Sequence, residues 1–348
     1  MRSSLLRSTR AWRACAAVAL LASALAAAPA PAQDTREAVP AEREGASVEK
    51  LFGALVKVTT HAVPDARSTS SLGADREGTG VVIGDDGLIL TIGYLVVEAD
   101  DVSVIDSGGR TLAARVVAYD HASGFALVRT LAAMAAQPVA LGDSAKLAAR
   151  EPVMIASAGE ESVAFAFVAS KRPFAGNWEY ALDEAIYTTP PIAHWSGAGL
   201  FDREGRLLGV GSLIVRNALD DDTALPGNMF VPIDALKPIL ADLVKSGRRA
   251  GPPRPWLGIN ADELQGRLFV TRVAPDGPAD RAGVQAGDII LAVGGDGVRT
   301  QAEFYRKVWA RGDAGSDIPL RLLQGIEVRE LAVRSIDRVD YFRPPTTY

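Results

Sequence analysis

The chain has 348 residues, of which 48% are hydrophobic and 23% charged, with one cysteine and a formal net charge of −5. This is the composition of an ordinary globular protein, and it excludes a disordered chain, a collagen-like repeat and a disulfide scaffold. A net negative charge also argues against a nucleic-acid binder with a basic footprint. The length suggests two or three domains, each able to bury its own core.

Residues 1–32 have the pattern of a secretory signal peptide. Four arginines precede an apolar stretch over residues 14–28, and small residues lead up to Ala32, after which we expect cleavage. The stretch is too short to cross a bilayer comfortably, which disfavours the alternative of an uncleaved anchor. Cleavage would remove Cys15, so the mature chain would have no disulfide, zinc thiolate site or thiol nucleophile. We therefore expect an exported protein, most simply periplasmic, with no stable membrane span.

A polar lead-in over residues 33–47 is followed by a first domain over residues 48–246 that is rich in hairpin signals. Strand-like runs flank turn residues three times, at 79–83 with 88–91, at 102–105 with 111–117, and at 199–201 with 206–210. Strands at this spacing predict an all-β sandwich or barrel region. A helical period over residues 234–246 is expected to close it. The acidic run Asp220 to Asp222 is interpreted as solvated loop charge, and no metal or cofactor site is expected.

Residues 247–253 have the composition of a linker. A second domain is predicted over residues 254–338, and the last ten residues, 339–348, have the composition of a tail. Within the second domain the sequence predicts strands near residues 268–273, 288–293 and 320–323, and helices at 279–282 and 301–310.

Several segments match one family in order along the chain. They are Gly78–Ile83 with Asp86–Thr91, then Leu141–Ser144, Gly227–Ile233, Trp256–Ile259 and Ala282–Ile290. This set resembles the HtrA (Deg) family of trypsin-like proteases with a C-terminal PDZ domain. The resemblance implies a mainly β chain, with two six-stranded barrels of the chymotrypsin fold followed by a PDZ domain. It also implies a serine protease site between the barrels.

The resemblance identifies the triad positions, and two of them are lost. Tyr94 stands where the family has the histidine base, and Gly124 where it has the aspartate. Ser196 aligns with the nucleophile, and His194 replaces the glycine that donates an N–H group to the oxyanion. A phenol with an ordinary pKa of about 10 is a poor proton acceptor near neutral pH. We therefore predict a pseudoprotease.

Two alternatives remain open for the first domain. One is an active serine endopeptidase in which His194 or His121 serves Ser196 as a rewired base. The other is a non-catalytic subunit that assembles with active HtrA-like proteases, or a homotrimer such as the family forms, with the apolar pair Leu51–Phe52 as weak support.

The aromatic residues Tyr94 and Trp195 flank the lost site in the alignment. We expect them to fill the old cleft rather than to form a peptide-binding patch, because a cleft without chemistry gains by being filled.

The PDZ-like domain keeps a complete binding motif. The resemblance implies that Trp256 opens a loop in which the N–H groups of Leu257, Gly258 and Ile259 receive a peptide carboxylate. Phe304 and Val308, one helical turn apart, are either the opposite wall of the groove or core residues. The predicted ligands are peptide or protein C-termini, bound in periplasmic quality control or regulation.

Overall fold

The computed structural model describes residues 50–159, 163–176, 180–219 and 223–345. The predicted signal peptide with Cys15, the lead-in over 33–47 and the acidic run at 220–222 lie outside the described residues. The last three residues of the predicted tail also lie outside them.

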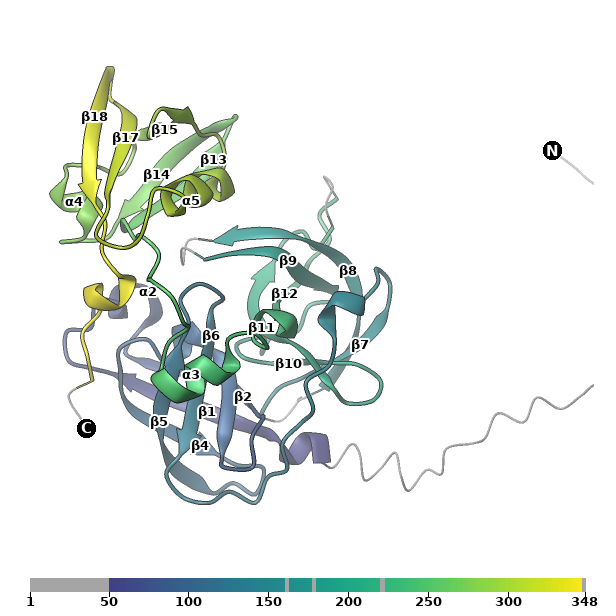
Figure 1. The fold of residues 1–348 in the computed structure, drawn as a ribbon. Coiled ribbons are helices and arrows are strands. Elements are labelled where there is room, and N and C mark those ends of the chain that lie inside the picture. The colour runs from purple at the N-terminus through teal and green to yellow at the C-terminus, as the bar shows by residue number, and fades with distance from the viewer. Residues whose placement is uncertain (1–49, 160–162, 177–179, 220–222, 346–348) are drawn as a thin grey trace, which may run out of the picture. The chain divides into compact units, whose positions relative to one another are not determined.

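The first domain begins with a closed barrel whose strands follow the order β1-β2-β3-β6-β5-β4 (Figure 1). Its strands are β1 (Leu55–Ala62), β2 (Asp75–Val82), β3 (Leu88–Ile92), β4 (Ala99–Ile105), β5 (Thr111–Tyr119) and β6 (Phe125–Thr130). A short helix α2 (Thr69–Leu72) and a 3₁₀ turn η1 (Gly93–Leu95) interrupt them. Gly80 is required inside this barrel, because a Cβ there would lie 2.4 Å from Ile89 Cγ2.

A second closed barrel follows, in the order β10-β11-β12-β9-β8-β7. Its strands are β7 (Pro152–Ala156), β8 (Val163–Gly176), β9 (Tyr180–Thr189), β10 (Gly199–Phe201), β11 (Leu207–Val215) and β12 (Gly227–Pro232). The 3₁₀ turns η2 (Ser144–Lys146) and η3 (Ile233–Ala235) precede and follow it. One continuous buried cluster includes residues of both barrels, among them Phe125 and Val210.

The three predicted hairpins are present as β2–β3, β4–β5 and β10–β11. The mainly β fold with a trypsin-like domain is thus confirmed. The helix predicted over 234–246 is wrong in its first half, since α3 covers only Leu240–Ser246. Pro238 explains the difference, because it lacks the N–H that a helix continuing from Asp234 would need.

The apolar pair Leu51–Phe52 is also corrected. Leu51 is 4% exposed within the barrel core, and Phe52 packs against that core. The pair therefore contributes to the first barrel and does not form an exposed patch for oligomer contacts.

The second domain is a sheet in the order β13-β14-β15-β17-β18, with β16 paired to β15 (Figure 1). Its strands are β13 (Ile259–Leu264), β14 (Arg267–Val273), β15 (Ile289–Val293), β16 (Asp296–Gly297), β17 (Asp317–Gln324) and β18 (Glu327–Arg334). The helices are α4 (Pro278–Arg281) and α5 (Gln301–Trp309), and a 3₁₀ turn η4 (Arg338–Tyr341) follows the sheet. Strand β18 was not predicted, because four of its first five residues are charged or exposed and give no alternating pattern.

Within the described part of the chain, no helix combines the length and the apolar character needed to cross a membrane.

Candidate active site and peptide-binding site

Tyr94 lies in the 3₁₀ turn directly after β3, on the first barrel. Its phenol donates a hydrogen bond to the carbonyl of Ser212 in β11, at 3.0 Å, and so links the two barrels. Burial raises the pKa of Tyr94 to about 12, although polar contact with Ser196 and Trp195 acts in the opposite direction. The phenol is therefore protonated at neutral pH and can donate a proton but not accept one.

Gly124 follows the turn at residues 121–123 and directly precedes β6, and it has φ +84, a conformation that favours glycine. Its carbonyl accepts a hydrogen bond from Gly93 N–H at 2.7 Å, beside Tyr94. A Cβ at Gly124 would lie 3.5 Å from the ring of Tyr180. That ring is 3% exposed, and its hydroxyl bonds Ser212 Oγ at 2.8 Å. A buried tyrosine thus occupies the space into which a longer side chain at position 124 would extend.

Ser196 lies in a tight turn before β10 that is fixed by backbone contacts. Its carbonyl accepts a hydrogen bond from Thr79 N–H at 2.8 Å. The next residue, Gly197, has φ +74, and a Cβ there would lie 2.0 Å from the carbonyl oxygen of Thr79. Ser196 Oγ is buried and has no hydrogen-bond partner among the described residues. The turn that presents the serine is thus well formed, but no base is bonded to its hydroxyl.

The three histidines of the chain all lie in the described residues, and none bonds Ser196. His61, in β1, pairs with Asp75 at 2.7 Å. The His121 ring packs against Tyr119 at a tilt of 46°, with ring centroids 3.9 Å apart, and burial with a nearby arginine lowers its pKa well below the usual value. His194 is exposed and makes no recorded hydrogen bond. Sequence reasoning named His121 and His194 as possible bases, and the structure brings neither into contact with the hydroxyl.

A cleft of about 350 Å³ remains beside Ser196, between β2 and the loop before β10. Trp195 and His194 line this cleft, together with Gly78 and Thr79. Trp195 is half-buried and lines the cleft that remains, so it does not fill the old cleft completely. Tyr94 packs against the core as expected, together with the buried Tyr180, a residue that no motif identified.

The loop before β13 has the shape of a carboxylate-binding turn. Gly258 has φ +79, and a Cβ there would lie 2.9 Å from Ala274 Cβ. Within the described part of the chain, the N–H groups of Leu257 and Gly258 have no recorded acceptor. Ile259 begins β13, which is the edge strand of its sheet and pairs only with β14. Two free donors thus lie next to an open strand edge.

Helix α5 lies beside this edge, since Gln301 N–H donates to Glu263 Oε1 of β13 at 3.0 Å. Phe304 and Val308 are 2% and 3% exposed and belong to the same buried cluster as Leu257 and Ile259.

The helix also contacts the β8–β9 hairpin. Tyr305 of α5 donates its hydroxyl proton to the Gly176 carbonyl at the end of β8, at 3.2 Å.

Trp256, the first residue of the loop, is covered by residues 338–343, which we call the C-terminal strap. Trp256 is 6% exposed, and the Tyr341 ring lies 4.6 Å from its ring. The guanidinium of Arg67 lies 4.4 Å over Tyr341, and Arg343 N–H donates to Glu98 Oε1 at 2.9 Å. Much of the predicted tail is therefore docked on the first barrel and on the loop before β13.

No group of three or more His, Cys, Asp or Glu among the described residues is placed to hold a metal ion.

Family models match two parts of the chain. Residues 78–210 match a trypsin-like peptidase domain, and residues 255–334 match a PDZ domain. These ranges cover most of both barrels and nearly all of the sheet that contains β13 to β18.

Curated relatives that the chain matches are named as serine endoproteases. The chain is 29% identical over 278 residues to a probable periplasmic serine endoprotease DegP-like of Pseudomonas putida, an alignment that covers 75% of this chain and 56% of the relative. It is 26% identical over 225 residues to the serine endoprotease DegS of Haemophilus influenzae, with 62% and 64% covered. The chain spans about half the length of the first curated relatives it matches.

Solved structures share the fold. The HtrA-type protease AlgW with a decapeptide superposes with a TM-score of 0.52 at 19% identity, covering 86% of this chain and 98% of that one. A serine endoprotease from Yersinia pestis gives a TM-score of 0.50 at 21% identity, covering 84% and 97%.

Proposed function

Because the chain belongs to the HtrA family of trypsin-like peptidases with a C-terminal PDZ domain, we propose that it is a pseudoprotease of that family. Its role is to bind the C-termini of peptides or proteins through the PDZ domain, as a regulator or scaffold in periplasmic protein quality control.

The observation that carries this proposal is the filled space at the lost triad. The Tyr94 phenol is held by Ser212 and has a raised pKa, so it cannot take the proton of Ser196. Tyr180 stands against Gly124, where the family has a carboxylate. Losing members of a triad commonly costs on the order of 10⁴-fold to 10⁶-fold in rate. Two replaced members, with no histidine bonded to the serine, are expected to leave no useful peptidase activity.

The PDZ domain supplies the binding function. A peptide C-terminus needs N–H donors for its carboxylate and a strand edge with which to pair. The N–H groups of Leu257 and Gly258 and the edge of β13 meet both needs, and the buried Trp256 precedes this loop and packs on Tyr341. Phe304 and Val308 are 2% and 3% exposed in the same buried cluster as Leu257 and Ile259, which supports a core role for them rather than an exposed wall of the groove.

The proposed compartment is the periplasm. It rests on the predicted signal peptide at residues 1–32 and on relatives whose names describe periplasmic endoproteases.

Labelling with a fluorophosphonate probe tests the dead site, because such a probe reacts with a serine only when its surroundings make it nucleophilic. We expect the purified protein and its Ser196→Ala variant to remain equally unlabelled, while an active HtrA-type protease is labelled in parallel. Labelling that disappears in the Ser196→Ala variant would contradict the pseudoprotease.

Fluorescence anisotropy tests the PDZ function with peptides that end in an apolar residue. We expect peptides with a free carboxylate to bind and their C-terminal amides not to bind. Gly258→Ala should weaken binding at least about tenfold, because its Cβ would distort the donor loop. Gly266→Ala is the matched control, since Gly266 has φ +70 but nothing lies within 4 Å of its Cβ position. Equal binding of acids and amides would refute carboxylate recognition.

An active endopeptidase is the second candidate, and the observation in its favour is the open cleft beside Ser196 with His194 on its wall. The fluorophosphonate experiment decides between the two, and loss of labelling in a His194→Ala variant would identify the rewired base. A third candidate, the non-catalytic subunit of an HtrA-like assembly, is tested by measuring the mass of the purified protein with and without an active family member. A protein that remains monomeric and does not bind this partner would exclude the third candidate.

A further inference from the structure

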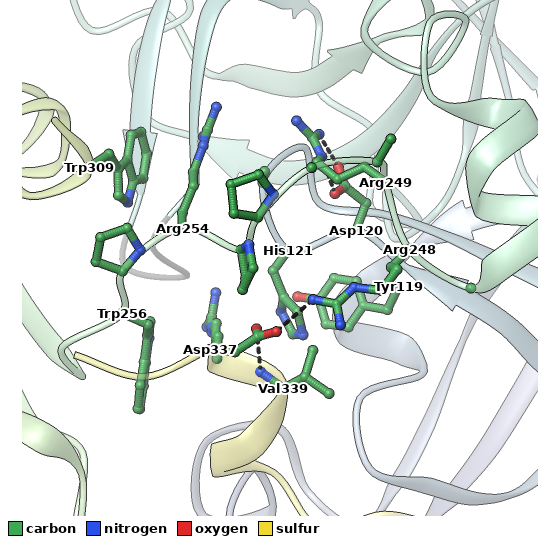
Figure 2. A pocket seen from close by; sticks show the side chains of 18 of the residues that line it. Tyr119, Asp120, His121, Arg248, Arg249, Arg254, Trp256, Trp309, Asp337 and Val339 are labelled. Atoms are coloured by element: carbon green, nitrogen blue, oxygen red, sulfur yellow. Dashed lines mark hydrogen bonds and ion pairs between the residues drawn. The ribbon is translucent and has the colours of Figure 1, made fainter. Parts of the chain in front are cut away.

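A cavity of about 430 Å³ lies around the linker, away from Ser196 (Figure 2). Its walls come from the end of β5 with the following turn, from residues 246–256, from the end of α5, and from the start of the C-terminal strap. This volume lies within the range of small-molecule sites in proteins.

The cavity has more positive than negative charge on its wall. Its lining contains four arginines but only two carboxylates, and each carboxylate is already paired. Asp120 accepts two hydrogen bonds from Arg249, including one of 2.7 Å from Nε to Oδ1. Asp337 pairs with Arg248 at 2.7 Å, and Figure 2 shows both pairs as dashed lines.

The two pairs leave Arg254 and Arg338, of which Arg338 is buried and Arg254 is exposed. The guanidinium carbon of Arg254 lies 4.4 Å over the ring of Trp309, and no described residue forms a hydrogen bond or an ion pair with it. Asp183 is near enough to influence Arg254 electrostatically but makes no recorded ion pair with it. A planar guanidinium that stacks on an indole keeps its N–H groups free to bind an oxyanion in a bidentate manner.

The lining also contains flat apolar groups and two buried polar atoms without partners. Trp256 and Trp309 contribute indole rings, and Pro252, Pro253 and Pro255 contribute proline rings. Trp256 Nε1 and His121 Nδ1 are buried and have no hydrogen-bond partner in the described structure. Buried polar atoms of this kind are rare in proteins and call for a partner.

We propose that this cavity binds a small aromatic oxyanion, that is, a carboxylate or phosphate attached to a flat ring. Arg254 binds the charged group, and the ring lies among the indoles and prolines. This site is separate from the peptide groove, and the proposal does not depend on the function proposed above.

Isothermal titration calorimetry of the mature protein tests the site with indole-3-carboxylate and phenyl phosphate as probes. Two control ligands test the charge and the ring separately. Indole-3-carboxamide has the ring without the charge, and inorganic phosphate has the charge without the ring. We expect one of the two aromatic anions to saturate with a Kd below about 1 mM, and the amide and inorganic phosphate to bind at least about tenfold more weakly. The preferred anion identifies the charged group as carboxylate or phosphate.

Arg254→Met keeps an unbranched side chain against Trp309 but removes the charge, and should weaken binding of the preferred anion at least about tenfold. Arg306→Met is the matched control, since Arg306 is exposed on α5, the helix that carries Trp309, and does not line the cavity. Trp309→Leu, which removes one indole ring, should weaken binding of that anion as well. Three outcomes would each overturn the proposal. They are no saturable binding of either aromatic anion, equal binding by wild type and Arg254→Met, and binding of inorganic phosphate as tight as that of phenyl phosphate.

Discussion

Restoring the two lost triad residues should not restore a protease. In the Gly124→Asp variant, the new residue must adopt the backbone angle φ +84, which costs about 1 kcal/mol for a residue with a Cβ. The Cβ itself fits at 3.5 Å from the Tyr180 ring, but the carboxylate beyond it would be buried against that ring. An unpaired buried charge costs several kcal/mol more. The total of about 4 kcal/mol is a large share of the roughly 5–15 kcal/mol that holds a domain folded.

Urea unfolding measures this cost, with Gly124→Ala as the control that adds the Cβ alone and should lose only about 1 kcal/mol. The double variant Tyr94→His with Gly124→Asp also loses the hydrogen bond to Ser212, worth about 1 kcal/mol. It should remain unlabelled by the fluorophosphonate probe. The reasoning fails if Gly124→Asp is as stable as Gly124→Ala, or if the double variant is labelled.

Three further predictions concern the contacts around the linker and strap. Arg249→Ala leaves the Asp120 carboxylate, which is 5% exposed, with hydrogen bonds from Ser123 but without a cation, and should lower the free energy of unfolding by about 3 kcal/mol. Adding Asp120→Asn to this variant should recover part of that loss in urea unfolding. Burial alone would raise the pKa of Glu98, but hydrogen bonds from the backbone of Arg343, Ser68 and Arg67 lower it from 4.5. The ionised Glu98 therefore contributes fully to the free energy of unfolding above pH 4.5, and this contribution is lost as the pH falls through the folded pKa. The free energy of unfolding of the wild type should therefore exceed that of Glu98→Gln by about 2 kcal/mol at pH 7 and by much less at pH 3. An equal difference at the two pH values would contradict this. The pKa of His121 is lowered, so NMR should find its ring neutral at pH 6, and stability should fall below pH 6.5 as the unfolded chain binds the extra proton; a ring that titrates near 6.5 would refute the burial argument.

The fold could be predicted largely from local signals. Turn residues such as Asp86 with Gly87, between short apolar runs, favour a hairpin, and the paired strands β2 and β3 agree with this prediction. The helix over 234–246 was overextended because its apolar period continued through Pro238, whose effect on the backbone outweighs the period. Strand β18 gave no signal, since it is exposed along most of its length and half of its residues are charged, so it lacks the alternation that identifies a half-buried strand.

The sequence by itself determined which residues stand at the catalytic positions, because Tyr94, Gly124 and Ser196 lie in short segments whose order is read along the chain. Only the tertiary structure decided what surrounds them. Tyr180 comes from a distant strand to cover Gly124, and Ser212 holds both tyrosines from another. In the same way, the cavity around Arg254 joins segments more than 200 residues apart. Such contacts depend on how the elements pack, and no local pattern along the chain encodes packing between residues so far apart.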